Sequence, residues 1–321
     1  MPDNQLLGPE STSGAPIVSV VMPSYQAAGH VRSALRALMV QETSVPYEVI
    51  VVDSSTDGTE QIVEQEFPRI NLLHFPDRCR VGAARNIGVA AARGEVILFA
   101  DSDTIPCATW VDQMYRAIRE GGVDAVGGAM SNGTPWSVSG SIGFYLEFFR
   151  FVAYNGEPRA ARFLVGGNSG FRREVLIGMP YANHSVGEDM MFSANLARNG
   201  QRLLFLPRAS VVHMNRKGFR NVFGYQRKVG HGTLLYRSQD SPKMMRLLNS
   251  APLLVFLIPF VVMPWIGISI LRRSVTDFGR LMVILPGCFV ANMVWAFGFH
   301  EALRLAARES RQGRRAWSSR L

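Results

Sequence analysis

The stretch Val96-Ile-Leu-Phe-Ala-Asp-Ser-Asp103 places two carboxylates, Asp101 and Asp103, at the end of an apolar run. A second run of the same kind, residues 48–52, ends at Asp53. Runs of Val and Ile predict buried strands, and ligands bind beyond the carboxyl ends of parallel strands. Paired carboxylates there can hold a hard divalent cation, which prefers oxygen ligands. Taken alone, the pair is more often a solvated turn, so its meaning depends on the rest of the chain.

Strand and helix patterns alternate through the first hundred residues. Buried strands are expected at 17–22, 48–52, 70–75 and 96–100, with helices at 30–40, 59–67 and 82–93. Repeated strand–helix units predict an α/β fold whose mostly parallel sheet is flanked by helices. Further along, helices are expected at 110–120, 188–198 and 219–237.

Composition indicates membrane contact. The 321 residues are 47% hydrophobic and 18% charged, with a net charge of +9. Two uncharged runs, 251–271 and 281–299, are each long enough to cross about 30 Å of hydrocarbon as a helix. They predict a C-terminal membrane helical hairpin. Three arginines in the linker 272–280 fit poorly with the positive-inside tendency if both helices span, so a re-entrant hairpin stays open.

The two ends of the chain bear on location. Residues 303–321 hold six arginines and one glutamate, without a nucleic-acid motif, so we expect contact with anionic lipids and no nucleic acid. Residues 1–15 lack the features of a secretory signal, and three scattered cysteines fit a reducing compartment. The expected location is therefore the cell (inner) membrane, with the first domain in the cytosol.

Five motifs occur in order along the chain: Val20-Val-Met-Pro-Ser-Tyr25, Val52-Asp-Ser-Ser-Thr-Asp-Gly-Thr59, Gly82-Ala-Ala-Arg-Asn-Ile-Gly88, Phe99-Ala-Asp-Ser-Asp103 and Gly187-Glu-Asp189. Together they resemble family 2 glycosyltransferases of the GT-A fold, over about residues 17–237. The resemblance implies an inverting transfer from a nucleotide diphosphate sugar to a hydroxyl acceptor, with Mg²⁺ or Mn²⁺. The apolar segments make a lipid-linked or envelope acceptor plausible.

The resemblance also assigns roles to residues. It implies that Asp189 is the general base and that Asp101 and Asp103 contact the ribose and the metal, with His213 as a further candidate metal ligand. The remaining candidates for substrate and nucleotide binding are Pro23, Tyr25, Asp53, Arg85, Gly167, Asn168 and Glu188. From the residues alone, Asp53 can accept hydrogen bonds from a base or ribose, and Asp189 opens a helix whose dipole it complements.

The expected organisation has five segments. They are a flexible tail (1–16), the nucleotide-sugar-binding half (17–105) and the acceptor-binding half (106–245) of one GT-A domain, two membrane helices (246–300) and a basic cytosolic tail (301–321). Processive relatives carry Gln-x-x-Arg-Trp, whereas this chain has Gln226-Arg-Lys-Val-Gly230, which favours addition of a single sugar. Two alternatives stay open at this stage, a noncatalytic sugar-nucleotide-binding scaffold at the membrane and a nucleotidyltransferase.

Overall fold

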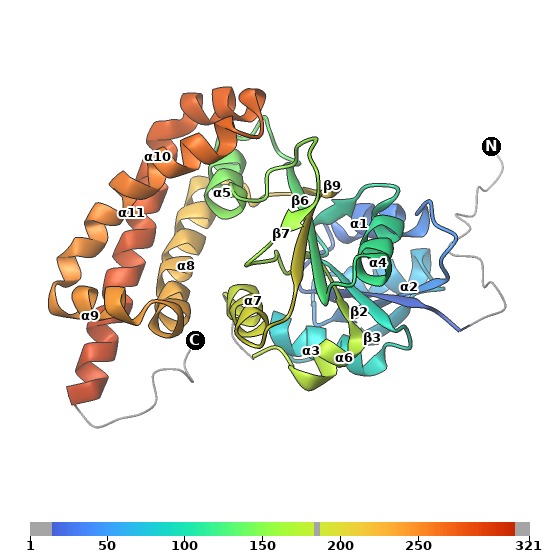
Figure 1. The fold of residues 1–321 in the computed structure, drawn as a ribbon. Coiled ribbons are helices and arrows are strands. Elements are labelled where there is room, and N and C mark those ends of the chain that lie inside the picture. The colour runs from blue at the N-terminus through green and yellow to red at the C-terminus, as the bar shows by residue number, and fades with distance from the viewer. Residues whose placement is uncertain (1–14, 183–186, 312–321) are drawn as a thin grey trace. The chain divides into compact units, whose positions relative to one another are not determined.

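The computed structural model describes residues 15–182 and 187–311 and divides them into two compact units (Figure 1). The first unit holds residues 15–131, 153–182 and 188–214, and the second holds 132–152, 187 and 215–311. The expected flexible tail, 1–16, and the end of the expected basic tail lie mainly outside the described residues.

The first unit is built on a nine-stranded sheet in the order β3-β2-β1-β4-β8-β6-β9-β5, with β7 paired to β9. The strands are β1 (Val18–Ser24), β2 (Tyr47–Asp53), β3 (Asn71–His74), β4 (Val96–Ala100), β5 (Thr104–Pro106), β6 (Ala125–Asn132), β7 (Arg159–Ala160), β8 (Asn168–Arg172) and β9 (Leu203–His213).

The sheet has a parallel part and an antiparallel part. Strands β1 to β4 pair in parallel, as the alternating pattern predicts, and the expected α/β fold with helices flanking a sheet is confirmed. Strand β8 then pairs antiparallel with both β4 and β6, and β5 pairs antiparallel with β9. The complete sheet is therefore mixed. Asp53 ends β2 and Asp101 follows β4, so both stand at carboxyl ends of parallel strands.

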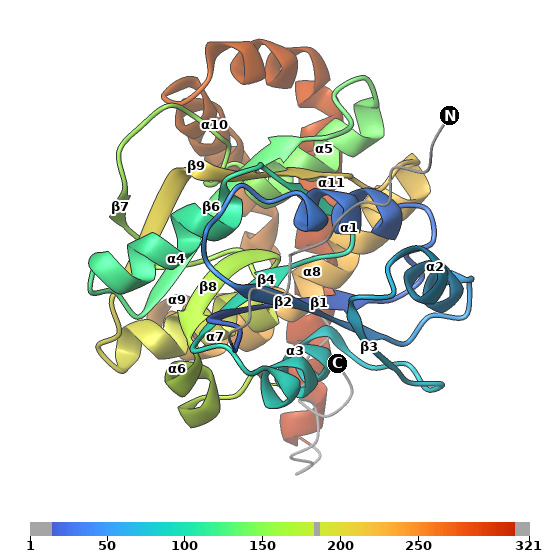
Figure 2. The ribbon, with the colours of Figure 1, turned by 90° about the vertical axis from the view of Figure 1, so that its right-hand side faces the viewer.

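Helices cover both faces of this sheet. Those of the first unit are α1 (Val31–Met39), α2 (Thr59–Glu66), α3 (Val81–Ala91), α4 (Trp110–Glu120), α6 (Arg173–Gly178) and α7 (Glu188–Arg198). Figure 2 shows α1 and α4 on one side of the central strands and α3 and α6 on the other. The parallel strands are therefore buried on both faces, which explains their continuous apolar sequences.

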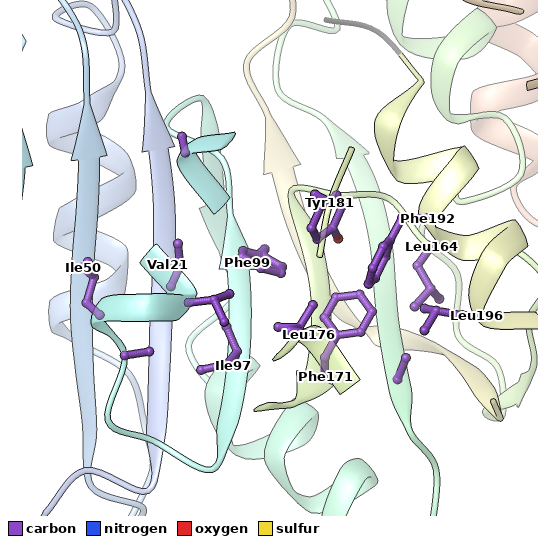
Figure 3. Packing of buried hydrophobic residues seen from close by; sticks show 14 of the residues in the cluster. Val21, Ile50, Ile97, Phe99, Leu164, Phe171, Leu176, Tyr181, Phe192 and Leu196 are labelled. Carbon is purple, nitrogen blue, oxygen red and sulfur yellow. The ribbon is translucent and has the colours of Figure 1, made fainter. Parts of the chain in front are cut away.

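An aromatic cluster fills the core between β4, β8, α7 and the segment around Tyr181 (Figure 3). Tyr181 stacks on Phe192 with ring centroids 4.1 Å apart, and Phe171 meets Phe192 edge-on at 5.5 Å. Phe99 contacts Tyr181 edge-on at 5.6 Å. Such stacked and edge-to-face pairs fix ring orientations more tightly than aliphatic contacts do.

The second unit is helical. It contains α5 (Val138–Phe148), α8 (Phe219–Asp240), α9 (Pro242–Ser250), the short helix η1 (Pro252–Leu257), α10 (Ile258–Leu271) and α11 (Val275–Arg311). By length and composition, Pro252–Leu271 and Val275–Glu309 are long and apolar enough to cross a membrane. They contain the expected run 281–299 and all but the first residue of the expected run 251–271.

This division differs from the predicted segments. The two expected halves of the GT-A domain, 17–105 and 106–245, both contribute strands to one sheet. Residues 132–152 and 215–245 instead pack with the apolar helices. The aromatic segment 144–154 shows why, since Phe149 meets Trp265 of α10 edge-on at 4.9 Å.

The contact between α3 and β1 generates a testable prediction. A Cβ added to Gly88 of α3 would overlap the side chain of Val21 in the buried β1 strand. We expect Gly88→Ala to lower the free energy of unfolding by about 1–3 kcal/mol, because a filled core resists an extra methyl group. Chemical denaturation measures the change. Val21→Ala in the same chain should restore part of the loss by making room.

Gly178→Ala in α6 is the matched control, because a Cβ there meets nothing within 4 Å. Equal effects of the two glycine substitutions would contradict the proposed overlap at Gly88.

Candidate active site

A buried arginine joins two carboxylates at the carboxyl end of the sheet. Arg85 of α3 donates from one terminal nitrogen to Glu188 Oε1 at 2.9 Å and from the other to Asp101 Oδ1 at 3.2 Å. Burial by itself lowers the pKa of Arg85, but the charges of Asp101 and Glu188 outweigh it and hold the pKa above its ordinary value. The guanidinium therefore stays charged and fixes both carboxylates, which lie 87 positions apart in sequence (188 − 101).

Aromatic rings hold this arginine in place. Its guanidinium carbon lies 5.2 Å from the ring centroid of Tyr181 and 5.6 Å from that of Phe99. Asn86, the next residue along α3, donates to the carbonyl of Tyr181 and accepts from its N–H, both at 2.9 Å. This reciprocal amide pairing ties the segment carrying Tyr181 to α3, so the core cluster beneath the site orients Arg85.

Glu188 and Asp189 open α7 but lie in different surroundings. Burial raises the pKa of Glu188 from 4.5 to about 7, the charge of Asp189 acts in the same direction, and Arg85 opposes both. Asp189 is half-buried, and its two oxygens accept the N–H groups of Gly166, at 3.2 Å, and Met190, at 2.8 Å. Two adjacent carboxylates with different environments are suited to different roles.

The loop before β8, which contains Gly166 and Gly167, packs directly against the side chains of Arg85 and Asp101. A Cβ on Gly166 would lie 2.5 Å from a terminal nitrogen of Arg85, and one on Gly167 would overlap the carboxylate of Asp101. Both positions therefore require glycine for close approach of the backbone. The loop links Asp189, Arg85 and Asp101, so the structure gathers these three predicted residues in one place.

Asp103 and His213 form a second part of the site. Strand β5 pairs with the end of β9 so that Thr104 lies opposite His213, and the N–H of Met214 donates to the carbonyl of Asp103 at 2.9 Å. This register puts His213 Nε2 at 3.7 Å from Asp103 Oδ2, farther than a hydrogen bond. Burial raises the pKa of Asp101, as does the charge of Asp103, while Arg85 and His213 lower it, so the two parts interact.

The structure tests whether these residues suit a metal ion. Over residues 15–182 and 187–311, no three His, Cys, Asp or Glu side chains gather closely enough to hold one by themselves. Asp101 faces Arg85, whereas Asp103 and His213 face each other. One carboxylate and one imidazole suit an ion that takes its other ligands from water and substrate phosphates. The residues therefore fit a metal ion that protein and substrate bind together, rather than one bound by protein ligands alone.

Asp53 lies inside the molecule. Its carboxylate is fully buried and accepts hydrogen bonds from the N–H and hydroxyl of Ser55, at 3.0 and 2.6 Å. His74 Nδ1 lies 2.8 Å from the same carboxylate, because β2 and β3 pair Asp53 with His74. Asp53 thus organises the loop after β2, and the structure offers no exposed atom for the predicted contact with a base or ribose.

The remaining predicted binding residues are spread. Tyr25 is exposed at the end of β1, with the Arg78 guanidinium 4.4 Å from its ring centroid, while Pro23 is buried within that strand. Asn168 is fully buried: its amide accepts from Trp110 Nε1 at 2.8 Å and donates to the carbonyls of Ala129 and Ala209. Direct substrate contact by Asn168 is not supported by this geometry, because its hydrogen bonds join strands.

Sequence reasoning missed two residues that build the site. His74 was overlooked because it is the last residue of an ordinary strand, β3, although its pairing with Asp53 at the strand end is the signal that identifies it. Tyr181 lies in an irregular segment outside any motif, and only the three-dimensional contact with Arg85 identifies it.

Known proteins resemble this chain in sequence and in fold. The model for glycosyl transferase family 2 matches residues 19–178. Glycosyltransferase AglE of Haloferax volcanii is 28% identical over 294 residues, which cover 88% of this chain and 95% of AglE.

Two solved structures share the fold. The mannosyltransferase PcManGT from Pyrobaculum calidifontis, in complex with GDP-Man and Mn²⁺, has a TM-score of 0.57 and 19% identity, covering 99% of this chain and 91% of that one. S. aureus TarS 1–349, in complex with UDP-GlcNAc, has a TM-score of 0.52 and 19% identity, covering 92% of each chain. These likenesses show the GT-A fold.

The chain belongs to glycosyltransferase family 2. It is an enzyme of the glycosyltransferase class, which disfavours both the scaffold and the nucleotidyltransferase alternatives.

The surroundings of Glu188 predict how stability depends on pH. Its pKa is raised from 4.5 to about 7 in the folded chain, so the folded state holds this proton more tightly than the unfolded state. Its contribution to stability is complete below pH 4.5 and is lost as the pH rises through about 7. We expect Glu188→Gln to remove this part of the pH dependence. Chemical denaturation of the ligand-free, detergent-solubilised protein at several pH values measures it.

The exposed Glu120 provides the matched control, and Glu120→Gln should leave the pH dependence unchanged. An unchanged pH profile in Glu188→Gln would show that the proton is held elsewhere.

Proposed function

We propose that this chain transfers a single sugar, with inversion, from a nucleotide diphosphate sugar to a hydroxyl acceptor, using Mg²⁺ or Mn²⁺. The observation that carries the proposal is the gathering of Asp101, Arg85 and Asp189 around the loop 166–167, with Asp103 and His213 alongside. The complexes of PcManGT with GDP-Man and of TarS with UDP-GlcNAc support a donor of this class.

Asp189 is the proposed general base. Backbone N–H groups of Gly166 and Met190 hold its carboxylate, and it is half-buried rather than enclosed. In the proposed step the carboxylate takes the proton of the acceptor hydroxyl while that oxygen bonds to the anomeric carbon. The bond from the anomeric carbon to the diphosphate breaks on the opposite face, and the electron pair leaves with the nucleoside diphosphate. A single displacement of this kind inverts the anomeric centre.

Charge explains why a cation is needed. Asp101, Asp103, Glu188 and Asp189 offer four carboxyl groups, and among the site residues described above Arg85 is the arginine that stands against them. Carboxylates repel an anionic diphosphate, so its binding here is unfavourable without a further cation. Asp103 and His213 would hold a divalent ion, with Asp101 nearby, and when bound that ion neutralises the charge that develops on the departing diphosphate.

The acceptor is proposed to be lipid-linked or part of the envelope, with transfer on the cytosolic face of the inner membrane. The support is compositional: the two long apolar helices that end the described chain, and the arginines around them. The replacement of Gln-x-x-Arg-Trp by Gln226-Arg-Lys-Val-Gly230 supports single-sugar addition.

The role of Asp189 is tested by Asp189→Asn. We expect kcat to fall by about 10²–10⁴-fold, because the base is lost while the hydrogen-bonded shape is retained. Release of nucleoside diphosphate from a panel of UDP- and GDP-sugars, with a membrane lipid extract as acceptor, measures the rate. Glu120→Gln is the control and should retain the full rate. Transfer at the wild-type rate in Asp189→Asn would exclude this residue as the base.

The metal requirement is tested by thermal shift as well as by turnover. EDTA should abolish transfer, and Mn²⁺ with the correct nucleotide sugar should raise the melting temperature of the wild type. Asp103→Asn should raise the Mn²⁺ concentration needed for that stabilisation by about tenfold or more. Asp77→Asn, at an exposed position, is the control. Equal Mn²⁺ dependence in the two variants would remove Asp103 from the proposed metal site.

A further inference from the structure

The apolar helices have charged neighbours within their own unit. Helix α8 runs beside α11 (Figure 1), and the two backbones come close where Gly230 meets Trp295 and where Gly298 meets Arg227. Arg227 donates to Glu301 at 2.7 and 2.6 Å, and Trp295 donates to Thr233 at 3.2 Å. One side of α11 is therefore covered by a polar helix.

The packing of α8 against α11 conflicts with a membrane-spanning position for α11. The expected span 281–299 includes the crossing at Trp295 and Gly298, so a bilayer around that span would also enclose part of α8. The Arg227 side chain is 54% exposed, and Lys228 beside it is exposed as well. Charged side chains facing hydrocarbon are expensive and rare.

The start of α11 is also held by polar contacts. Tyr145 of α5 donates to Asp277 Oδ1 at 2.8 Å, and α5 reaches farther along α11, where Ile142 occupies the space beside Gly287. Helix α5 lies in the segment 132–152 of the second unit. In the sequence this segment interrupts the first unit, which carries the candidate site and is called the catalytic unit below. The start of α11, next to the linker, is thus tied to a segment that the chain connects at both ends, through residues 131 and 153, to the catalytic unit.

Other sides of α10 and α11 carry exposed apolar side chains. On α10 the exposed residues include Phe260, Val261 and Ile268, and on α11 they include Val275, Val283 and Val290. Phe260 and Val261 lie eight and seven residues before Ile268, and Val275, Val283 and Val290 follow at intervals of eight and seven, so each set lies along one side of its helix. Val261 is 73% exposed and Val283 81%, values typical of side chains that a bilayer rather than a protein core covers.

A groove between the two helices continues this apolar face. Its volume is about 710 Å³, and its lining includes Met263, Gly267 and Leu271 of α10 and Phe278, Met282 and Phe289 of α11. At the linker end of the groove stand Arg272, Arg273 and Arg280, within two residues of its lining. Apolar surface bordered by arginine matches acyl chains below anionic headgroups.

We infer that α10 and α11 lie along one leaflet of an anionic bilayer, with the linker 272–274 on the same side of the membrane as the catalytic unit. The inference rests on the membrane attachment proposed above and specifies its form. In this placement the linker faces the same compartment as the two outer ends of the hairpin. The arginines of the linker therefore no longer conflict with the positive-inside tendency.

Cysteine labelling tests this placement. In a chain carrying Cys79→Ser, Cys107→Ser and Cys288→Ala, single cysteines are introduced as Thr276→Cys near the linker and Glu120→Cys in the catalytic unit. A membrane-impermeant maleimide is applied to inside-out and right-side-out membrane vesicles. We expect both cysteines to react in inside-out vesicles alone. Reaction of Thr276→Cys in right-side-out vesicles, or in neither preparation before detergent is added, would overturn the inference.

The outcomes separate this inference from the proposals before it. A chain found in the soluble fraction would overturn membrane attachment itself, whereas a membrane-bound chain with the opposite labelling overturns only the placement in one leaflet. Sugar transfer is measured independently of both.

A second experiment tests the apolar face directly. Val261→Asp with Val283→Asp should weaken binding to vesicles containing phosphatidylglycerol by about tenfold or more, because apolar area is lost and negative charge is added. Val40→Asp, at an exposed position of the catalytic unit, is the control. Circular dichroism checks that each variant is folded. Unchanged vesicle binding by the folded double variant would contradict the inference.

Discussion

The candidate site depends on one buried charge, the guanidinium of Arg85. Removing a cation from water costs several kcal/mol, and that cost is offset only when its partners are well placed. Asp101 and Glu188 supply the opposite charge, and the rings of Tyr181 and Phe99 supply flat surfaces beside the guanidinium. The arginine therefore determines where the end of β4, the start of α7 and the core cluster meet.

Much of this arrangement follows from local sequence. Strands β1 to β4 are continuous apolar runs, and the carboxylates after them could be placed at one edge because parallel strands share a direction. The extension of the sheet by antiparallel strands was not predictable in the same way. Strands β8 and β6 pair across large sequence separations, and short segments such as 168–172 carry no strong periodicity.

The individual site residues likewise include some whose position was predictable from sequence and some whose position was not. Arg85, Asp101 and Asp189 lie together as the ordered motifs suggested, whereas Asp53 and Asn168 turned inward. Polar residues at strand ends serve equally well as ligand contacts or as hydrogen-bonding partners for loops, and sequence does not distinguish the two. No local pattern indicates that the segment 132–152 packs with helices more than a hundred residues later.

The register of β5 on β9 carries a consequence for how this architecture tolerates change. Thr104 faces His213 only while the pairing keeps its present alignment, and successive side chains of a strand point to opposite faces. Adding or deleting one residue within β9 would turn the His213 imidazole away from the Asp103 carboxylate, although neither residue is substituted. The register of β9 therefore fixes the position of His213, and a change of length is better accommodated in the connections between strands.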